Sequence, residues 1–116
     1  MQYVLFIYQG TTPLPDTDAW ASLSEAERQA IYADYAALNG RPGVTPGLPL
    51  GLAETATTVR VVDGTVVATD GPYAEPVGGS LVIEAADIDA AVEVAAGIPA
   101  ARHGGAIEIR PVETYW

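Results

Sequence analysis

The sequence predicts an α+β protein in which an antiparallel sheet is covered on one face by two helices. Three observations support this prediction: an apolar and aromatic run near the N-terminus, two stretches with helical periodicity, and a hairpin signal between those stretches. Elements in the order β-α-β-β-β-α-β are typical of layered α+β folds. At 116 residues the chain is long enough for one hydrophobic core, so we expect a single domain over residues 1–116.

The first strand and the first helix have the clearest patterns. Residues 3–8 are apolar or aromatic throughout, which is typical of a strand covered on both faces. Ser24 and Glu27 have the spacing of a capping box, in which each side chain satisfies the other residue's backbone amide, and Ser22 with Glu25 has the same spacing. Apolar residues then recur at helical intervals before Asn39-Gly40, which predicts a helix over 24–39 (Ile31, Tyr35 and Leu38).

The middle of the chain predicts an irregular segment followed by a hairpin. Residues 41–56 are rich in proline and glycine, so we expect an extended loop without a long regular element. Its apolar residues are candidates for a lid that packs down on the core (Val44, Leu48, Leu50 and Leu52). Residues 57–62 and 65–69 then flank Asp63-Gly64, a pair that suits the positive φ angles of a type I′ turn.

The last third of the chain completes a ferredoxin-like arrangement. Residues 80–85 predict a strand, and Asp87 is a suitable N-cap for a second helix that ends at Gly97. Residues 106–112 alternate as a final strand with a proline near its end. Both helices then lie on one face of the sheet and leave the other face open. Because the first strand is apolar on both alternations, we expect two copies to pack sheet against sheet as a homodimer.

Composition excludes several classes of partner. The net charge is −10 and the five cations, all arginines, form no cluster, so we expect neither nucleic acid nor a membrane surface as a partner. The chain has no cysteine, and one histidine with scattered carboxylates is a poor metal site, so we expect no metal and no cofactor. The run at 3–8 is too short for a signal peptide or a membrane span, and a cytoplasmic location is the expectation.

The stretch from Asp70 to Glu75 is the leading candidate for a functional site. It places two carboxylates and the Tyr73 ring between two strands, where a plain connector needs only turn residues. Asp70 either fixes the turn before Gly-Pro by accepting backbone amides, or faces a pocket and acts as a general base. Glu75 is either solvated or catalytic, and Tyr73 either packs in the core or contacts a substrate.

Three residues outside this stretch are further candidates. His103, the only histidine, lies in a loop before the last strand, where it is either solvated or assists proton transfer. Arg110 either pairs with a nearby acid across strands or clamps an acidic ligand. We expect Tyr8 to contact a substrate and, together with Tyr32 and Tyr35, to line the core and a pocket.

Several segments also follow the pattern of a known family, in the same order along the chain. They are the opening strand with its Ser-x-x-Glu helix, the hairpin around Asp63-Gly64, the stretch 69–75, and three later segments (83–87, 98–102 and 108–112). On these residues the chain resembles the DGPF group of YCII-related proteins. The resemblance implies a ferredoxin-like domain that dimerises into an α+β barrel, in agreement with the elements predicted above.

Two departures from the family pattern bear on function. Tyr73 stands where the motif has phenylalanine, which adds one hydroxyl to the same ring. After Glu75 the family continues with a polar Thr-Lys-Glu-like stretch, whereas this chain has Pro76-Val77-Gly78-Gly79. Any role that the Lys or Glu of that stretch plays in relatives is therefore absent here.

Three hypotheses for function follow. In the first, the protein is a cofactor-independent enzyme that isomerises, eliminates from or cyclises a small organic molecule. Asp70 is then the acid or base with His103 assisting, and the remaining candidates bind the substrate (Tyr73, Glu75, Tyr8 and Arg110). In the second, it is a non-catalytic small-molecule-binding or accessory dimer. In the third, the motif is only a turn and the interior is filled, so a cavity faced by Asp70 and Glu75 distinguishes the pocket hypotheses from the third.

Overall fold

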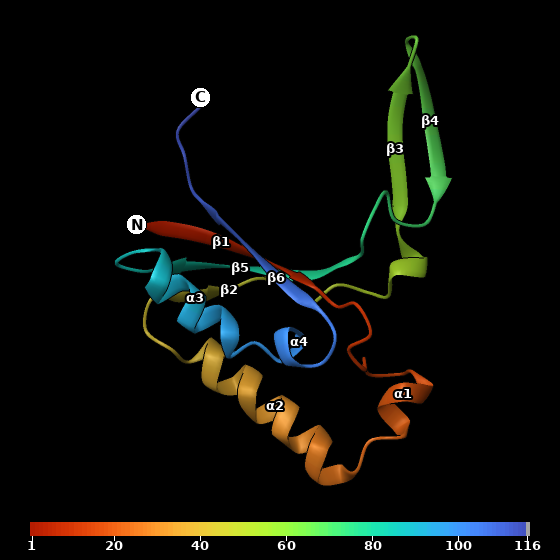
Figure 1. The fold of residues 1–116 in the computed structure, drawn as a ribbon. Helices are drawn as coiled ribbons and strands as arrows, with labels where there is room; N and C mark the ends of the chain where they lie inside the picture. The colour runs from red at the N-terminus through yellow and green to blue at the C-terminus, as the bar shows by residue number, and fades with distance from the viewer. Residues whose placement is uncertain (116) are drawn as a thin grey trace.

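Residues 1–115, which the computed structural model describes, form a four-stranded antiparallel sheet with helices on one face and a separate hairpin (Figure 1). The order of strands across the sheet is β2 (Val44–Pro46), β5 (Val77–Glu84), β1 (Gln2–Tyr8) and β6 (Ala106–Pro111). Helix α2 (Glu25–Asn39) connects β1 to β2, and α3 (Ile88–Ala96) connects β5 to β6. This is the α+β, ferredoxin-like arrangement that the sequence predicts.

The core lies between the sheet and the helices. Alternate residues of β1 face the helices, and their neighbours on β5 do the same, because Leu5 pairs with Leu81 and Tyr3 with Ile83. Leu5 is 0% exposed and Ile83 is 1% exposed. The helical side of the core comes from α2, α3 and the segment that follows α3 (Leu38, Ala91, Val94, Ala95 and Ile98). The other alternation of β1 is only partly buried on the opposite face (Val4, Phe6 and Tyr8).

The predicted helix starts are confirmed, with one difference of detail. The Ser24 hydroxyl accepts a hydrogen bond from the Glu27 amide at 3.1 Å and donates one to the Glu27 carboxylate at 3.1 Å, so the carboxylate meets the hydroxyl and not the Ser24 amide. Asp87 caps α3 by accepting from the Ala90 amide at 2.9 Å. Ser22 ends α1 (Asp18–Ala21) instead of starting α2.

Two four-residue helices, α1 and α4 (Pro99–Arg102), lie outside the sequence prediction. A helix of one turn shows too few residues for a periodic apolar face to be recognised. No helix of the described residues is long and apolar enough to cross a membrane.

The hairpin does not belong to the main sheet. Strands β3 (Thr57–Val62) and β4 (Thr65–Asp70) pair only with each other, and the turn between them has the expected positive φ angles, 49° at Asp63 and 79° at Gly64. The fourth strand of the main sheet is instead β2, a three-residue strand within the irregular segment 41–56 that also holds a short 3₁₀ helix, η1 (Ala53–Thr55). Since β1 and β2 already occupy both edges of β5, the hairpin has no free edge there to join.

Candidate functional site

A pocket lies between the sheet and α2. It has a volume of about 590 Å³, within the range of roughly 300–1,000 Å³ that is typical of small-molecule sites. The sheet forms one side through Ile7, Gly79 and Leu81, and α2 forms the opposite side through Ile31, Tyr35 and Leu38. Two irregular segments complete the wall: residues 12–16 with Trp20, and residues 46–52. We call this the main pocket.

The proline- and glycine-rich segment is a fixed wall of this pocket. The Gly47 amide donates to the Ser80 carbonyl at 3.0 Å, and the Leu50 amide donates to the Gly78 carbonyl at 3.3 Å, so the segment runs along β5. A Cβ at position 47 would overlap the Ser80 carbonyl oxygen, which explains the glycine. Three of the four predicted lid residues line the main pocket from this segment (Leu48, Leu50 and Leu52).

Three uncharged polar side chains, Gln9, Thr12 and Tyr35, lie in this mainly apolar wall. Desolvation by burial raises the pKa of the Tyr35 hydroxyl. A hydrogen bond with the Gln9 side chain lowers that pKa, but by less than burial raises it. Gln9 Oε1 and Thr12 Oγ1 are buried and have no hydrogen-bond partner among the described residues. Gly78 leaves the space that the Gln9 amide fills, since a Cβ at that position would overlap it. Tyr35, Gln9 and Thr12 thus add uncharged polar residues to the pocket lining.

A second, more open pocket of about 490 Å³ lies beside the predicted motif. Tyr8, Tyr73 and Glu75 line it together, so the structure brings three of the six candidate residues into one place. Tyr73 is 76% exposed, which is incompatible with a role as core packing. Residues 50–52 line both pockets and separate them.

Asp70 lies outside both pockets, exposed at the end of β4. The turn that follows it is held by other groups: the Gly71 amide donates to the Ala56 carbonyl at 2.8 Å, and the Thr58 hydroxyl donates to the Gly71 carbonyl at 2.7 Å. None of the hydrogen bonds found within residues 1–115 ends on the Asp70 carboxylate. The backbone of Gly71 and the Thr58 hydroxyl therefore fix the turn, which was one of the two roles considered for Asp70.

His103 and Arg110 are also absent from the walls of both pockets. His103 is exposed where α4 ends, and it lines neither pocket. Arg110 is exposed on β6, and its Nε pairs with Glu108 Oε2 at 3.0 Å. The two residues are neighbours on one face of the same strand, so the ion pair expected for Arg110 forms along the strand and not across strands. Within the described part of the chain, no three acidic or histidine side chains gather as a metal site.

The pocket residues that the sequence analysis misses are Gln9 and Thr12. Both lie in the stretch Gln9–Pro15, whose composition indicates only that the first strand ends there. A weak signal was present: Gln9 directly follows a strand predicted to be buried on both faces, and Thr12 comes three residues later. Tyr32 and Tyr35 line the main pocket as expected.

Comparison with known proteins places the fold in a family. The family model of the YCII-related domain matches residues 1–115, nearly the whole chain. The match is to the YCII-related domain as a whole, and the DGPF group within it stays a prediction. No curated protein matches the chain.

Proposed function

The chain belongs to the YCII-related domain family, and we propose that this member is a cytoplasmic small-molecule-binding protein whose ligand occupies the main pocket. The size and the wall of that pocket support the proposal: about 590 Å³ lined mainly by aliphatic and aromatic side chains, with a few polar side chains of which only Asp16 is charged. A concave apolar site with a few convergent polar groups is typical of small-molecule binding. The ligand expected is an uncharged, mainly apolar organic molecule.

Binding without turnover fits this pocket better than catalysis. Burial raises the pKa of Tyr35, so at neutral pH its hydroxyl is a neutral hydrogen-bonding group and not a base. Asp16 is the single carboxylate among the lining residues, and it is exposed to water. General-base catalysis needs a basic group within hydrogen-bond reach of the substrate.

A neutral fluorescent probe tests the proposal. N-phenyl-1-naphthylamine is apolar and uncharged, and Trp20 in the pocket wall is positioned to transfer excitation energy to it. We expect saturable binding of the probe with sensitised emission. We expect Gly79→Leu to abolish it, because Gly79 lies opposite Ile7 in the sheet and a side chain there enters the pocket. A Cβ at position 79 has room, since its nearest neighbour is the Leu48 carbonyl oxygen at 3.8 Å.

The matched control is Ala96→Leu, which adds similar bulk at an exposed position of α3 outside the pocket. This variant should bind the probe as the wild type does. Absence of saturable binding to the wild type, or equal binding by Gly79→Leu in a folded state, contradicts the proposal.

A second candidate function is cofactor-free acid-base chemistry at the more open pocket. It is favoured by one observation, that Glu75, Tyr73 and Tyr8 line the same space. The proton transfer would then fall to Glu75, because Asp70 and His103 lie outside that pocket. A ligand that is consumed by the wild type but recovered unchanged from Glu75→Gln would support this candidate. Recovery unchanged from both proteins favours binding alone.

A further inference from the structure

The chain exposes more surface than a compact protein of its size. A 12.0 kDa monomer is expected to expose about 6,000 Å², whereas this chain exposes 7810 Å². Its radius of gyration is 16.1 Å, against about 13 Å for a compact domain of this length. The surplus of about 1,800 Å² is within the range that one subunit of an obligate dimer buries, about 1,000–2,500 Å².

The hairpin formed by β3 and β4, which we call the arm, contributes to this surplus. Val59 pairs with Ala68 and Val61 with Val66, so these four residues form one continuous apolar face. The three valines are 61%, 67% and 68% exposed in the order Val59, Val61 and Val66. The opposite face is mainly polar (Thr58, Arg60, Thr65 and Thr69, with Val62 and Val67). An isolated two-stranded hairpin is marginally stable in water, so the arm needs a cover for its apolar face.

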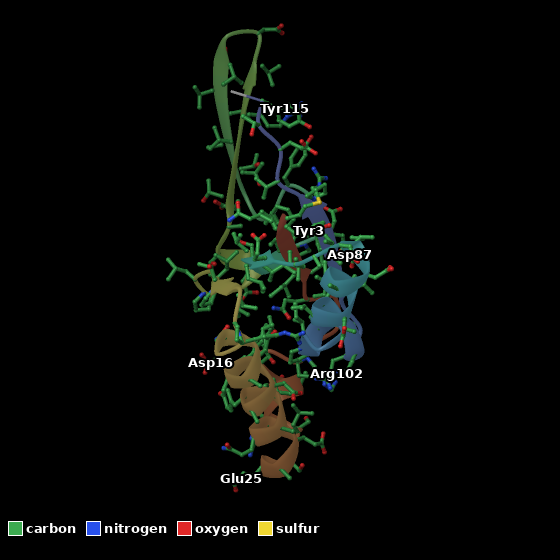
Figure 2. All side chains as sticks on the ribbon, turned by 90° about the vertical axis from the view of Figure 1, so that its left-hand side faces the viewer. Tyr3, Asp16, Glu25, Asp87, Arg102 and Tyr115 are labelled. Atoms are coloured by element: carbon green, nitrogen blue, oxygen red, sulfur yellow. The ribbon has the colours of Figure 1, made fainter. Side chains whose placement is uncertain are left out.

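The open face of the main sheet borders the same space as the arm. The arm rises on the side of the sheet away from α2, both in Figure 1 and in the view turned by 90° in Figure 2. This face of the sheet presents partly buried apolar side chains from β1 and β5 (Val4, Phe6, Tyr8 and Val82). One chain thus carries two unpartnered apolar surfaces that meet at an angle.

Charge also favours contact through this face. The protein has a net charge of −10, which opposes the approach of a second copy. On the strands of the open face, however, both acids have a cation beside them: Glu84 pairs with the N-terminal amine at 2.9 Å, and Glu108 pairs with Arg110 at 3.0 Å. The open face is therefore close to neutral, and two copies can meet there without strong repulsion.

From these observations we propose that the arm is a dimerisation arm. Its valine face packs on the open sheet face of a second copy of the chain, and the second copy returns its own arm in the same way. Such an exchange is self-complementary and closes at two subunits. The partner is thus identical to the chain itself, and the interface includes the arm as well as the sheet faces expected from the sequence. The inference stands apart from the ligand proposal, because no arm residue lines the main pocket.

The triple variant V59T/V61T/V66T tests the arm. Threonine keeps the β-branched shape and removes apolar area, so the hairpin can still form while its docking weakens. By sedimentation velocity at micromolar concentrations we expect a wild-type dimer and a monomeric triple variant, with the dissociation constant raised by about 100-fold or more. The matched control V62T/V67T changes the opposite face of the same hairpin and should remain dimeric.

A crosslinking measurement identifies what the arm contacts. Because the chain has no cysteine, the variant V61C can be labelled with a benzophenone maleimide at a single site. Crosslinks in the dimer band that map to β1, β5 or β6 support the proposal. A monomeric wild type, a dimeric triple variant, dissociation of the control to the same extent, or crosslinks confined to the partner's arm each overturn it.

Discussion

The body of the molecule and the arm are built from equally strand-like sequence, yet they differ completely in what covers them. In the body, β1 alternates between side chains buried under the helices and side chains on the open face. In the arm, every residue from Val59 to Asp70 is exposed. The two regions differ because helices α2 and α3 follow strands of the main sheet, whereas the arm is joined to the body only at its base (Figure 1).

The difference shows that an alternating apolar pattern predicts the strand conformation but does not predict whether the strand is buried. Val59 and Val61 repeat with the same period as Leu5 and Ile7, and both patterns predict strands correctly. Burial requires a second layer, which is a property of the whole chain or of its assembly. The same apolar residue should therefore contribute very differently to stability in the two regions.

The largest expected effect comes from removing core volume in the body. Ile83→Ala creates a cavity in the hydrophobic core and should lower the free energy of unfolding by about 2–5 kcal/mol. Val62→Ala in the arm, on the face turned away from the proposed interface, should lower it by less than about 1 kcal/mol. Urea unfolding followed by circular dichroism measures both values. Equal losses would mean that the arm is packed in the folded monomer, and the contrast between the two regions would fail.

Most of the fold was predictable from the sequence for physical reasons. The Ser24 and Asp87 caps, the periodic face of α2 and the Asp63-Gly64 turn are local signals, and each lies where it was expected. The strand β2 was not predictable, because three residues including Pro46 carry almost no local preference. It becomes a strand only because β5 offers it an edge.

Smaller effects on stability are expected from two local features, the cap of α3 in the body and the turn of the arm. Asp87→Ala removes the cap of α3 and should lower the global free energy of unfolding by about 1 kcal/mol. Gly64→Ala forces a side chain into a left-handed turn position, with φ of 79°, at a cost of about 1–2 kcal/mol. Because the arm stands apart from the body, this cost should appear in hydrogen exchange of the β3 and β4 amides and leave the urea midpoint of a dilute monomeric sample unchanged. A matching loss in the urea midpoint would show that arm and body unfold together.

The candidate site shows the limits of sequence interpretation more sharply than the fold does. Asp70, Tyr73 and Glu75 stand out because they are close in sequence, but only the latter two share a pocket. The polar groups of the main pocket come from distant segments: Gln9 follows β1, and Tyr35 lies on α2. Their meeting depends on how α2 packs against the sheet, which is a tertiary property.

The smallest expected effect concerns Tyr35 and the closure of the main pocket. Burial raises its pKa in the folded state, so the stability that this group contributes is fully present below the unfolded value of about 10 and is lost as pH rises through the folded value. Tyr35→Phe should therefore remove part of the loss of stability above about pH 10. Near neutrality it should cost only the hydrogen bond with Gln9, about 1 kcal/mol.

Urea midpoints of the two proteins, measured from neutral pH to about pH 11, test this expectation. The curves should lie a constant distance apart up to about pH 10 and converge above it, because only the wild type must keep a buried phenol protonated. Curves that stay parallel throughout would mean that water reaches the Tyr35 hydroxyl. The main pocket would then be open to water at Tyr35, and this would weaken the case for it as a binding site.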